Sequence, residues 1–253
     1  MARVHFRSIL IIIITLICIV AVFLRDPIPQ DQAYHHFADT RTILSIDNFW
    51  NVISNLPFLL LGIIGLLRSD VFKKPLEGTS IAYAFLCIGV AGIGLGSAYY
   101  HYAPSNASFV WDRIPMTITF MSFFSIVISR YINYRAGIIL LLPLLLAGVI
   151  SVFFWYWTEL KGAGDLRLYA LVQFYPMIII PLIIFIYPTT RVVKIELLGL
   201  ILLYVVAKVF ERQDMTVYQT GKIISGHSLK HIFAAGSIVL MLRMNKEIKN
   251  ISY

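Results

Sequence analysis

The chain has 253 residues, of which 59% are hydrophobic and only 13% are charged. Soluble globular domains carry about 25% charged residues, so this composition excludes a soluble domain and indicates a membrane protein. The formal net charge is +8, but the basic residues stand in short loops between apolar runs, a pattern that suits anionic lipid headgroups and argues against nucleic-acid binding.

Apolar windows long enough to cross a bilayer recur along the whole chain, because a bilayer core of about 30 Å needs about 20 apolar residues in a helix. In chain order they cover residues 8–24, 49–67, 80–102, 114–132, 137–157, 168–187, 195–210 and 223–242. The seventh window is short and contains Lys208. We therefore predict an all-α polytopic membrane protein, with helices kinked at Pro57, Pro143, Pro176 and Pro181.

The first window has the basic start, at Arg3 and Arg7, and the apolar run of a signal peptide. Its apolar run is longer than that of a typical signal peptide, and no small-x-small cleavage motif follows it. We expect residues 1–30 to form an uncleaved signal-anchor helix and linker, which precede a membrane domain at 31–253.

The orientation follows from the Lys and Arg residues on alternate sides of the windows. With the N-terminus inside, the inner segments carry twelve and the outer segments eight, while Lys230 lies within a window. This bias predicts that both termini are cytoplasmic. A bacterial inner membrane fits this arrangement, and a eukaryotic secretory membrane stays open.

Three histidines are predicted to lie at one depth in the membrane. His227 and His231 are four residues apart, so their rings project from one face of a helix, as in helices that supply two imidazoles to zinc. His101 ends the third window on the outer side, where the eighth window begins. Three imidazoles plus a water form an open, catalytic type of zinc site. Ser97, one turn before His101, and Asp112, at the start of the fourth window, fall in the same layer.

Each of these residues also has a purely structural interpretation. A membrane histidine is often an interhelical hydrogen-bond partner, Ser97 could serve helix packing beside neighbouring glycines, and Asp112 could pair with Arg113. The conjunction of all five at one depth favours a metal site near the outer face. Lys230 is expected to face another direction, and either to snorkel or to pair with an acid such as Asp214 rather than to bind metal.

Four segments carry a resemblance to a known family. They are Phe-Trp-Asn-Val-Ile-Ser-Asn at 49–55, Gly-Leu-Gly-Ser at 94–97 followed by His101, Trp-Asp-Arg-Ile-Pro-Met at 111–116, and Gly-His-Ser-Leu-Lys-His at 226–231. Over residues 31–243 the chain resembles the alkaline ceramidase family, of the CREST superfamily of seven-helix membrane hydrolases that also includes the progestin and adipoQ receptors.

The resemblance implies that His101, His227 and His231 bind zinc and that Ser97 and Asp112 complete the active site. It also implies a seven-helix bundle built from the second to eighth windows, with the first window as an extra N-terminal transmembrane helix. The implied activity is zinc-dependent hydrolysis of the amide bond of a ceramide-like lipid, which gives a sphingoid base and a fatty acid. Asp112 would act as the general base, and Ser97 would bind the oxyanion or orient a ligand.

The chain departs from the animal ceramidases at their calcium-binding segment. An acid that precedes the Phe-Trp-Asn motif in those proteins is replaced here by Asn48, so a calcium site is not expected and the sphingolipid identity of the substrate stays open. The loop at 34–41 is more similar to the bacterial branch. His35, Asp39 and Asp47 either line the site or are ordinary solvated loop residues.

Three alternatives to a ceramidase stay open at this point. One is a hydrolase of another acyl lipid, with the same site. Another is a receptor-like protein that binds lipid around a structural zinc. A transporter with a proton relay is disfavoured, because its polar residues would lie near the membrane midplane rather than towards one face. The sequence does not indicate the oligomeric state.

Overall fold

The computed structural model describes residues 2–69 and 78–249, and within them the fold is all-α, with one isolated bridge between Ile43 and Ile46. The elements are α1 (Ala2–Phe23), the 3-10 helix η1 (Gln32–His35), α2 (Phe49–Ile53), α3 (Leu56–Leu67), α4 (Gly78–Tyr102), α5 (Asn106–Val127), the π-helix η3 (Ile128–Ile132), α6 (Tyr134–Leu160), α7 (Arg167–Ile186), α8 (Arg191–Arg212), α9 (Asp214–Gly221) and α10 (Gly226–Lys249).

Helices occupy all eight predicted windows, and the prediction of an all-α polytopic membrane protein is confirmed. Among the described residues, six helices are long and apolar enough to cross a membrane, or seven if α9 and α10, bent by 111° at their break, form one span. The helix in the seventh window, α8, falls outside this set because it carries several charged residues along its length.

The second window contains two helices instead of one kinked helix. The α2 helix ends at Ile53, with Ser54 as its C-cap, and Pro57 lies in the first turn of α3. Proline is tolerated there because the first amides of a helix have no intrahelical partner. Pro143, Pro176 and Pro181 lie inside helices that continue through them, namely α6 and α7.

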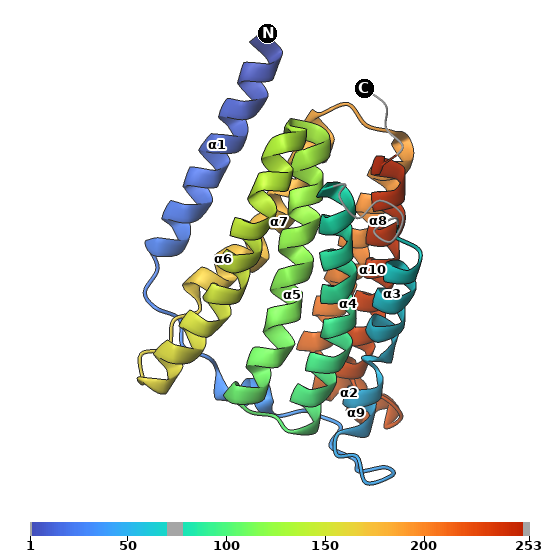
Figure 1. Ribbon diagram of the computed structural model, residues 1–253. Helices are drawn as coiled ribbons and strands as arrows, with labels where there is room; N and C mark the ends of the chain where they lie inside the picture. The colour runs from blue at the N-terminus through green and yellow to red at the C-terminus, as the bar shows by residue number, and fades with distance from the viewer. Residues whose placement is uncertain (1, 70–77, 250–253) are drawn as a thin grey trace.

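Small residues bring the central helices into backbone contact. A Cβ atom on Gly62 would collide with the backbone of Cys87 and Ala91 in α4, and one on Gly94 would collide with the backbone of Leu59 in α3. Membrane helices associate largely through such close packing. The first helix, α1, lies at the edge of the bundle against α7 (Figure 1).

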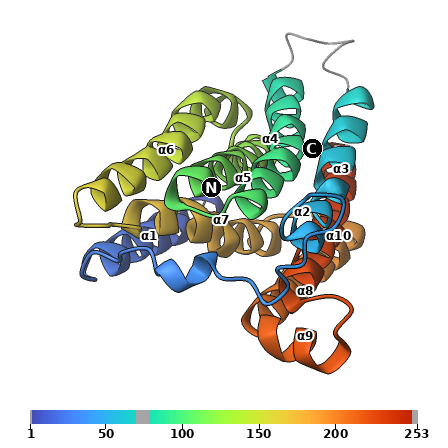
Figure 2. The same cartoon turned by 90° about the horizontal axis from the view of Figure 1, so that it is seen from below.

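Successive long helices run in alternate directions, so their ends collect at two opposite ends of the bundle. The start of α1 and the end of α10 lie together at one end (Figure 1). The end of α4 and the starts of α5 and α10 lie at the other, where the linker at 24–48 passes across the bundle (Figure 2). The candidate site residues come from these three helix ends.

Candidate metal centre

The turn from α4 into α5 is fixed by local capping. After α4, Ser108 donates its hydroxyl to the carbonyl of Ala103, and Ser105 accepts a hydrogen bond from the amide of Ser108 in a capping box. A capped start of this kind fixes where a helix begins. It places Asp112 on the second turn of α5, beside the last turns of α4.

The backbones of α4 and α5 meet next to the predicted catalytic pair. A Cβ atom on Gly96 would overlap the carbonyl oxygen of Trp111, so only glycine permits this approach. The adjacent residues, Ser97 and Asp112, are both buried and form a side-chain hydrogen bond. The helix contact therefore brings the predicted serine and aspartate together.

The start of α10 is held by two side chains from outside the helix. Asp214 of α9 accepts a hydrogen bond of 2.7 Å from the amide of His227, and Ser225 accepts one of 3.2 Å from the amide of Ser228. Gly226 lets the turn pack closely, because a Cβ atom there would collide with the backbone of Phe210 and Asp214. These contacts fix the direction in which His227 and His231 leave the helix.

The three predicted ligand histidines form a buried cluster. The side chains of His101, His227 and His231 are only 1%, 5% and 4% exposed, and one nitrogen from each lies within 4.8 Å of the other two. The Nε2 atoms of His101 and His231 are 3.2 Å apart. In a tetrahedral zinc site with Zn–N bonds of about 2.0–2.1 Å, two ligand nitrogens are about 3.4 Å apart. The cluster can therefore hold a metal ion.

Ser54, at the break between α2 and α3, orients His231. The Ser54 oxygen lies 3.1 Å from the carbonyl oxygen of Asn51 and 2.7 Å from Nδ1 of His231, and we assign the hydroxyl proton to the Asn51 carbonyl and the Nδ1 proton to the Ser54 oxygen. The Nε2 lone pair of His231 is then left to face His101. This is the arrangement that a metal-binding imidazole requires, with its second nitrogen donating to an oxygen.

Lys230 pairs with an acid, as predicted, but the acid is Glu211 and not Asp214, which was named as an example. The ammonium group of Lys230 lies 3.0 Å from Glu211 and also 2.9 Å from Nε2 of His227, so it reaches the cluster instead of facing away from it. Asp214 instead caps α10. Since the lysine donates to the lone pair of Nε2, coordination through that nitrogen requires Lys230 to swing aside. The second nitrogen of His101, Nδ1, has no partner among the described side chains and backbone.

The linker at 24–48 covers the cluster. The ring of Phe37 lies against His101 and His227, with ring centroids 4.7 and 5.0 Å apart. Burial, followed by the negative charge of Glu211, raises the pKa of Tyr34, so its hydroxyl stays protonated and donates to Glu211 at 2.5 Å. The linker therefore contributes an apolar cover over the imidazoles and a polar anchor beside them.

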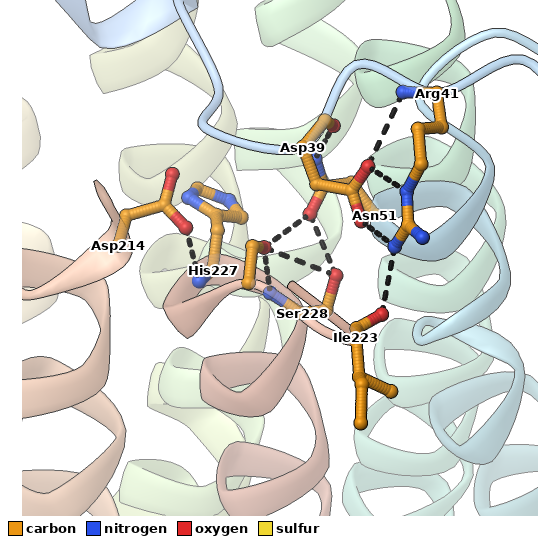
Figure 3. Close-up of polar contacts among 8 residues, drawn as sticks. Asp39, Arg41, Asn51, Asp214, Ile223, His227 and Ser228 are labelled. Carbon is orange, nitrogen blue, oxygen red and sulfur yellow. Dashed lines mark hydrogen bonds and ion pairs between the residues drawn. The ribbon is translucent and has the colours of Figure 1, made fainter. Parts of the chain in front are cut away.

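Polar contacts tie the linker to α2 and α10 (Figure 3). Asp39 is 1% exposed and forms an ion pair with Arg41, which also donates to the carbonyl of Ile223. Asn51 donates to the carbonyl of Asp39 and accepts from the hydroxyl of Ser228 at 2.7 Å. These residues hold the cover in place and do not reach the imidazoles as ligands.

The remaining linker candidates are structural. Both ring nitrogens of His35 are engaged, with Tyr100 and Asn106, so His35 anchors the linker to the α4–α5 corner. Asp47 is exposed and accepts from Thr42. Asn48, where animal ceramidases carry an acid, donates to the carbonyl of His101 at 2.8 Å.

The alternative ion pair between Asp112 and Arg113 is absent among the described residues. Arg113 points away from Asp112, and its guanidinium group lies over the rings of Phe109, Trp155 and Tyr169, 4.0–4.5 Å from their centroids. The carboxylate of Asp112 is thus free of an ion pair with Arg113, and the side chain beside it is Ser97.

Two further residues build the site and were not predicted from the sequence, namely Ser54 and Asn51. Both belong to the segment at 49–55 that contributed to the family resemblance, but no spacing connects position 54 with position 231. Only the fold shows that a serine at a helix break orients a histidine far along the chain.

Comparison with known proteins adds a family assignment to this geometry. Residues 41–249 match the family model described as Ceramidase, and this range contains all three histidines together with Ser97 and Asp112. No curated protein matches the chain.

Proposed function

The chain belongs to the ceramidase family, and from this premise we propose that it is a zinc-dependent intramembrane hydrolase of a ceramide-like lipid. The products would be a sphingoid base and a fatty acid. The observation that carries the proposal is the buried cluster of His101, His227 and His231 at the end of the bundle where α4, α5 and α10 meet.

The donor set favours zinc as the metal. Three imidazoles are a common zinc ligand set, and they leave a fourth tetrahedral position for water or substrate. When bound, such an ion would supply Lewis-acid chemistry, since it would lower the pKa of water to about 7 and polarise a carbonyl oxygen. The hydrogen bond from His231 to Ser54 keeps one ligand in the binding tautomer.

In this proposal Asp112 is the general base. It is buried, it lies on α5 beside the last turns of α4, which carry His101, and it is not one of the clustered ligand residues. Its carboxylate would accept a proton from the attacking water and pass it to the leaving amine. Ser97 donates its hydroxyl to Asp112 and so holds the carboxylate in place.

The position of the cluster suits a lipid amide. The cluster lies at the ends of helices that are long and apolar enough to cross a membrane, and Phe37 packs against it. In this proposal that end lies at the headgroup layer, where the amide of a membrane lipid would be found. The distribution of Lys and Arg supports placing this end at the outer face of the membrane. Acyl chains can then remain in the apolar layer while the amide reaches the imidazoles.

The test is fatty-acid release from a defined ceramide by purified protein, followed by mass spectrometry of both products. We expect equal amounts of fatty acid and sphingoid base, loss of release after chelation, and recovery on addition of zinc. Stoichiometric binding of ceramide without release would favour a receptor-like protein. Release from an ester or an N-acyl amino lipid, but not from ceramide, would keep the hydrolase and change its substrate.

A further inference from the structure

A network of polar side chains lies beside the histidine cluster, and Glu211, near the end of α8, is its centre. The carboxylate of Glu211 accepts the hydroxyl of Tyr34, in η1, at 2.5 Å and the ammonium group of Lys230, in α10, at 3.0 Å. It also accepts from Lys208, one turn earlier in α8, at 2.6 Å. One carboxylate therefore joins the linker, α8 and α10.

Lys230 is shared between this network and the cluster. Its ammonium group lies 2.9 Å from Nε2 of His227, and within the described part of the chain Glu211 is the acid with which it forms an ion pair. An ammonium group donates hydrogen bonds and has no lone pair to accept one. Nε2 of His227 must therefore accept, and the proton of the neutral ring is then on Nδ1.

The contact between Lys230 and His227 is incompatible with metal binding by His227, whichever ring nitrogen is the ligand. A histidine ligand is neutral and keeps one ring proton. If Nε2 is the ligand atom, its lone pair is no longer available to Lys230. If Nδ1 is the ligand atom, the ring proton is on Nε2, and two donors would face each other. In both cases the ammonium group has to leave His227.

Glu211 is placed to keep the ammonium group when it leaves His227. The side chains of Lys230 and Glu211 are only 17% and 15% exposed, and a cation in such a position is costly without an anion beside it. Lys230 and the Tyr34 hydroxyl both contact Oε1 of Glu211, so Tyr34 fixes the oxygen that faces the lysine. Lys208 contacts the other oxygen, Oε2, and does not compete for Oε1.

We propose that Glu211 is a positioning residue of the metal centre, which draws Lys230 away from His227 and so frees this imidazole to bind an ion. Tyr34 orients the Glu211 carboxylate and thereby couples the seating of the linker to metal binding. Neither Glu211 nor Tyr34 belongs to the clustered ligand residues. The inference rests on the proposed metal centre and adds to it a control by α8 and the linker.

The test is a double-mutant cycle on zinc affinity, measured on the full-length protein by competition with a chelator. E211Q removes the charge of the carboxylate, and K230Q removes the competing ammonium group. In the wild-type background E211Q should weaken zinc binding about tenfold. In the K230Q background it should weaken zinc binding less than about threefold, because no ammonium group is left to draw away. Equal weakening in both backgrounds would overturn the proposal, because it would indicate direct attraction between Glu211 and the ion.

Lys208 provides the matched control, because it pairs with the same carboxylate and has no histidine contact among the described residues. K208Q makes the same change in net charge as K230Q. It should alter zinc affinity less than about threefold, whereas K230Q should tighten zinc binding about tenfold. Equal tightening in the two variants would overturn the proposal, because it would show an effect of net charge alone.

Y34F keeps the test decisive if E211Q does not fold. It removes the hydroxyl that orients Glu211 and keeps the ring that stacks on Phe109. Y34F should weaken zinc binding in the wild-type background and not in the K230Q background, and the same loss in both would overturn the proposal. A wild type that binds no zinc would refute the metal centre itself. Zinc binding that is equal in wild type, K208Q and K230Q would refute only the role of Glu211.

Discussion

The hydrogen bond from His231 to Ser54 allows the metal centre to be perturbed without removing a ligand. Ser54 Oγ is 2.7 Å from Nδ1 of His231, and both side chains are buried. In S54A the Nδ1 proton loses its acceptor. The imidazole can then exchange its tautomer and rotate. In a fraction of the molecules the lone pair of Nε2 no longer faces the cluster.

The expected magnitude follows from two separate effects. Partners that orient metal-bound imidazoles are worth about 10- to 100-fold in metal affinity, or ~1.4–2.7 kcal/mol. A buried donor without a partner also costs about 1–3 kcal/mol of folding free energy. We therefore expect S54A to bind zinc about 10- to 100-fold more weakly than wild type. Without metal, S54A should also melt at a lower temperature than wild type.

The assay is zinc competition with a fluorescent chelator at fixed pH. The control is S237A, which also removes a buried hydroxyl. Ser237 lies in α10, and its hydroxyl donates to the carbonyl of Ala234 at 2.6 Å. It should leave the zinc affinity within about twofold of wild type. A zinc affinity in S54A that equals wild type, or an equal loss in S237A, would refute the role assigned to Ser54.

Three further changes test other parts of the site. D112N should retain zinc but lose about 10²- to 10⁴-fold in turnover, because it removes the proposed base; full activity would exclude that role. G96A should lower the free energy of unfolding by about 1–3 kcal/mol in a denaturation experiment, because its Cβ overlaps the α5 backbone, whereas G221A, which faces open space, should not. K230Q removes the ammonium group that occupies Nε2 of His227, so zinc binding should tighten by about tenfold, and weaker binding would contradict this competition.

The sequence was sufficient to predict the helices and the gathering of three histidines at one end of the bundle. The helices follow from apolar windows whose length matches a bilayer, and the depth of the histidines follows from counting those windows. The spacing of four residues placed His227 and His231 on one helix face. The alternating direction of successive helices placed His101 at the same end of the bundle. The fold adds how close the rings lie and which nitrogens face each other.

The parts that could not be predicted depend on contacts between distant segments. Lys230 was expected to face away from the pair of histidines, but it follows His227 by three residues, a spacing at which helical side chains meet, and its long side chain reaches both His227 and Glu211. Pairing with Glu211 depends on how α8 packs against α10, which periodicity does not reveal. The break between α2 and α3 at Ser54 was not predicted, because the length of an apolar window does not show whether one continuous helix fills it.

Metal content is the most direct test of the account, which depends on three histidines sharing one ion. Elemental analysis of the purified wild type should find one zinc per chain, and the H227A/H231A double variant should contain almost none while remaining folded. Zinc retained at the wild-type level by the double variant would contradict the assignment of these imidazoles as its ligands.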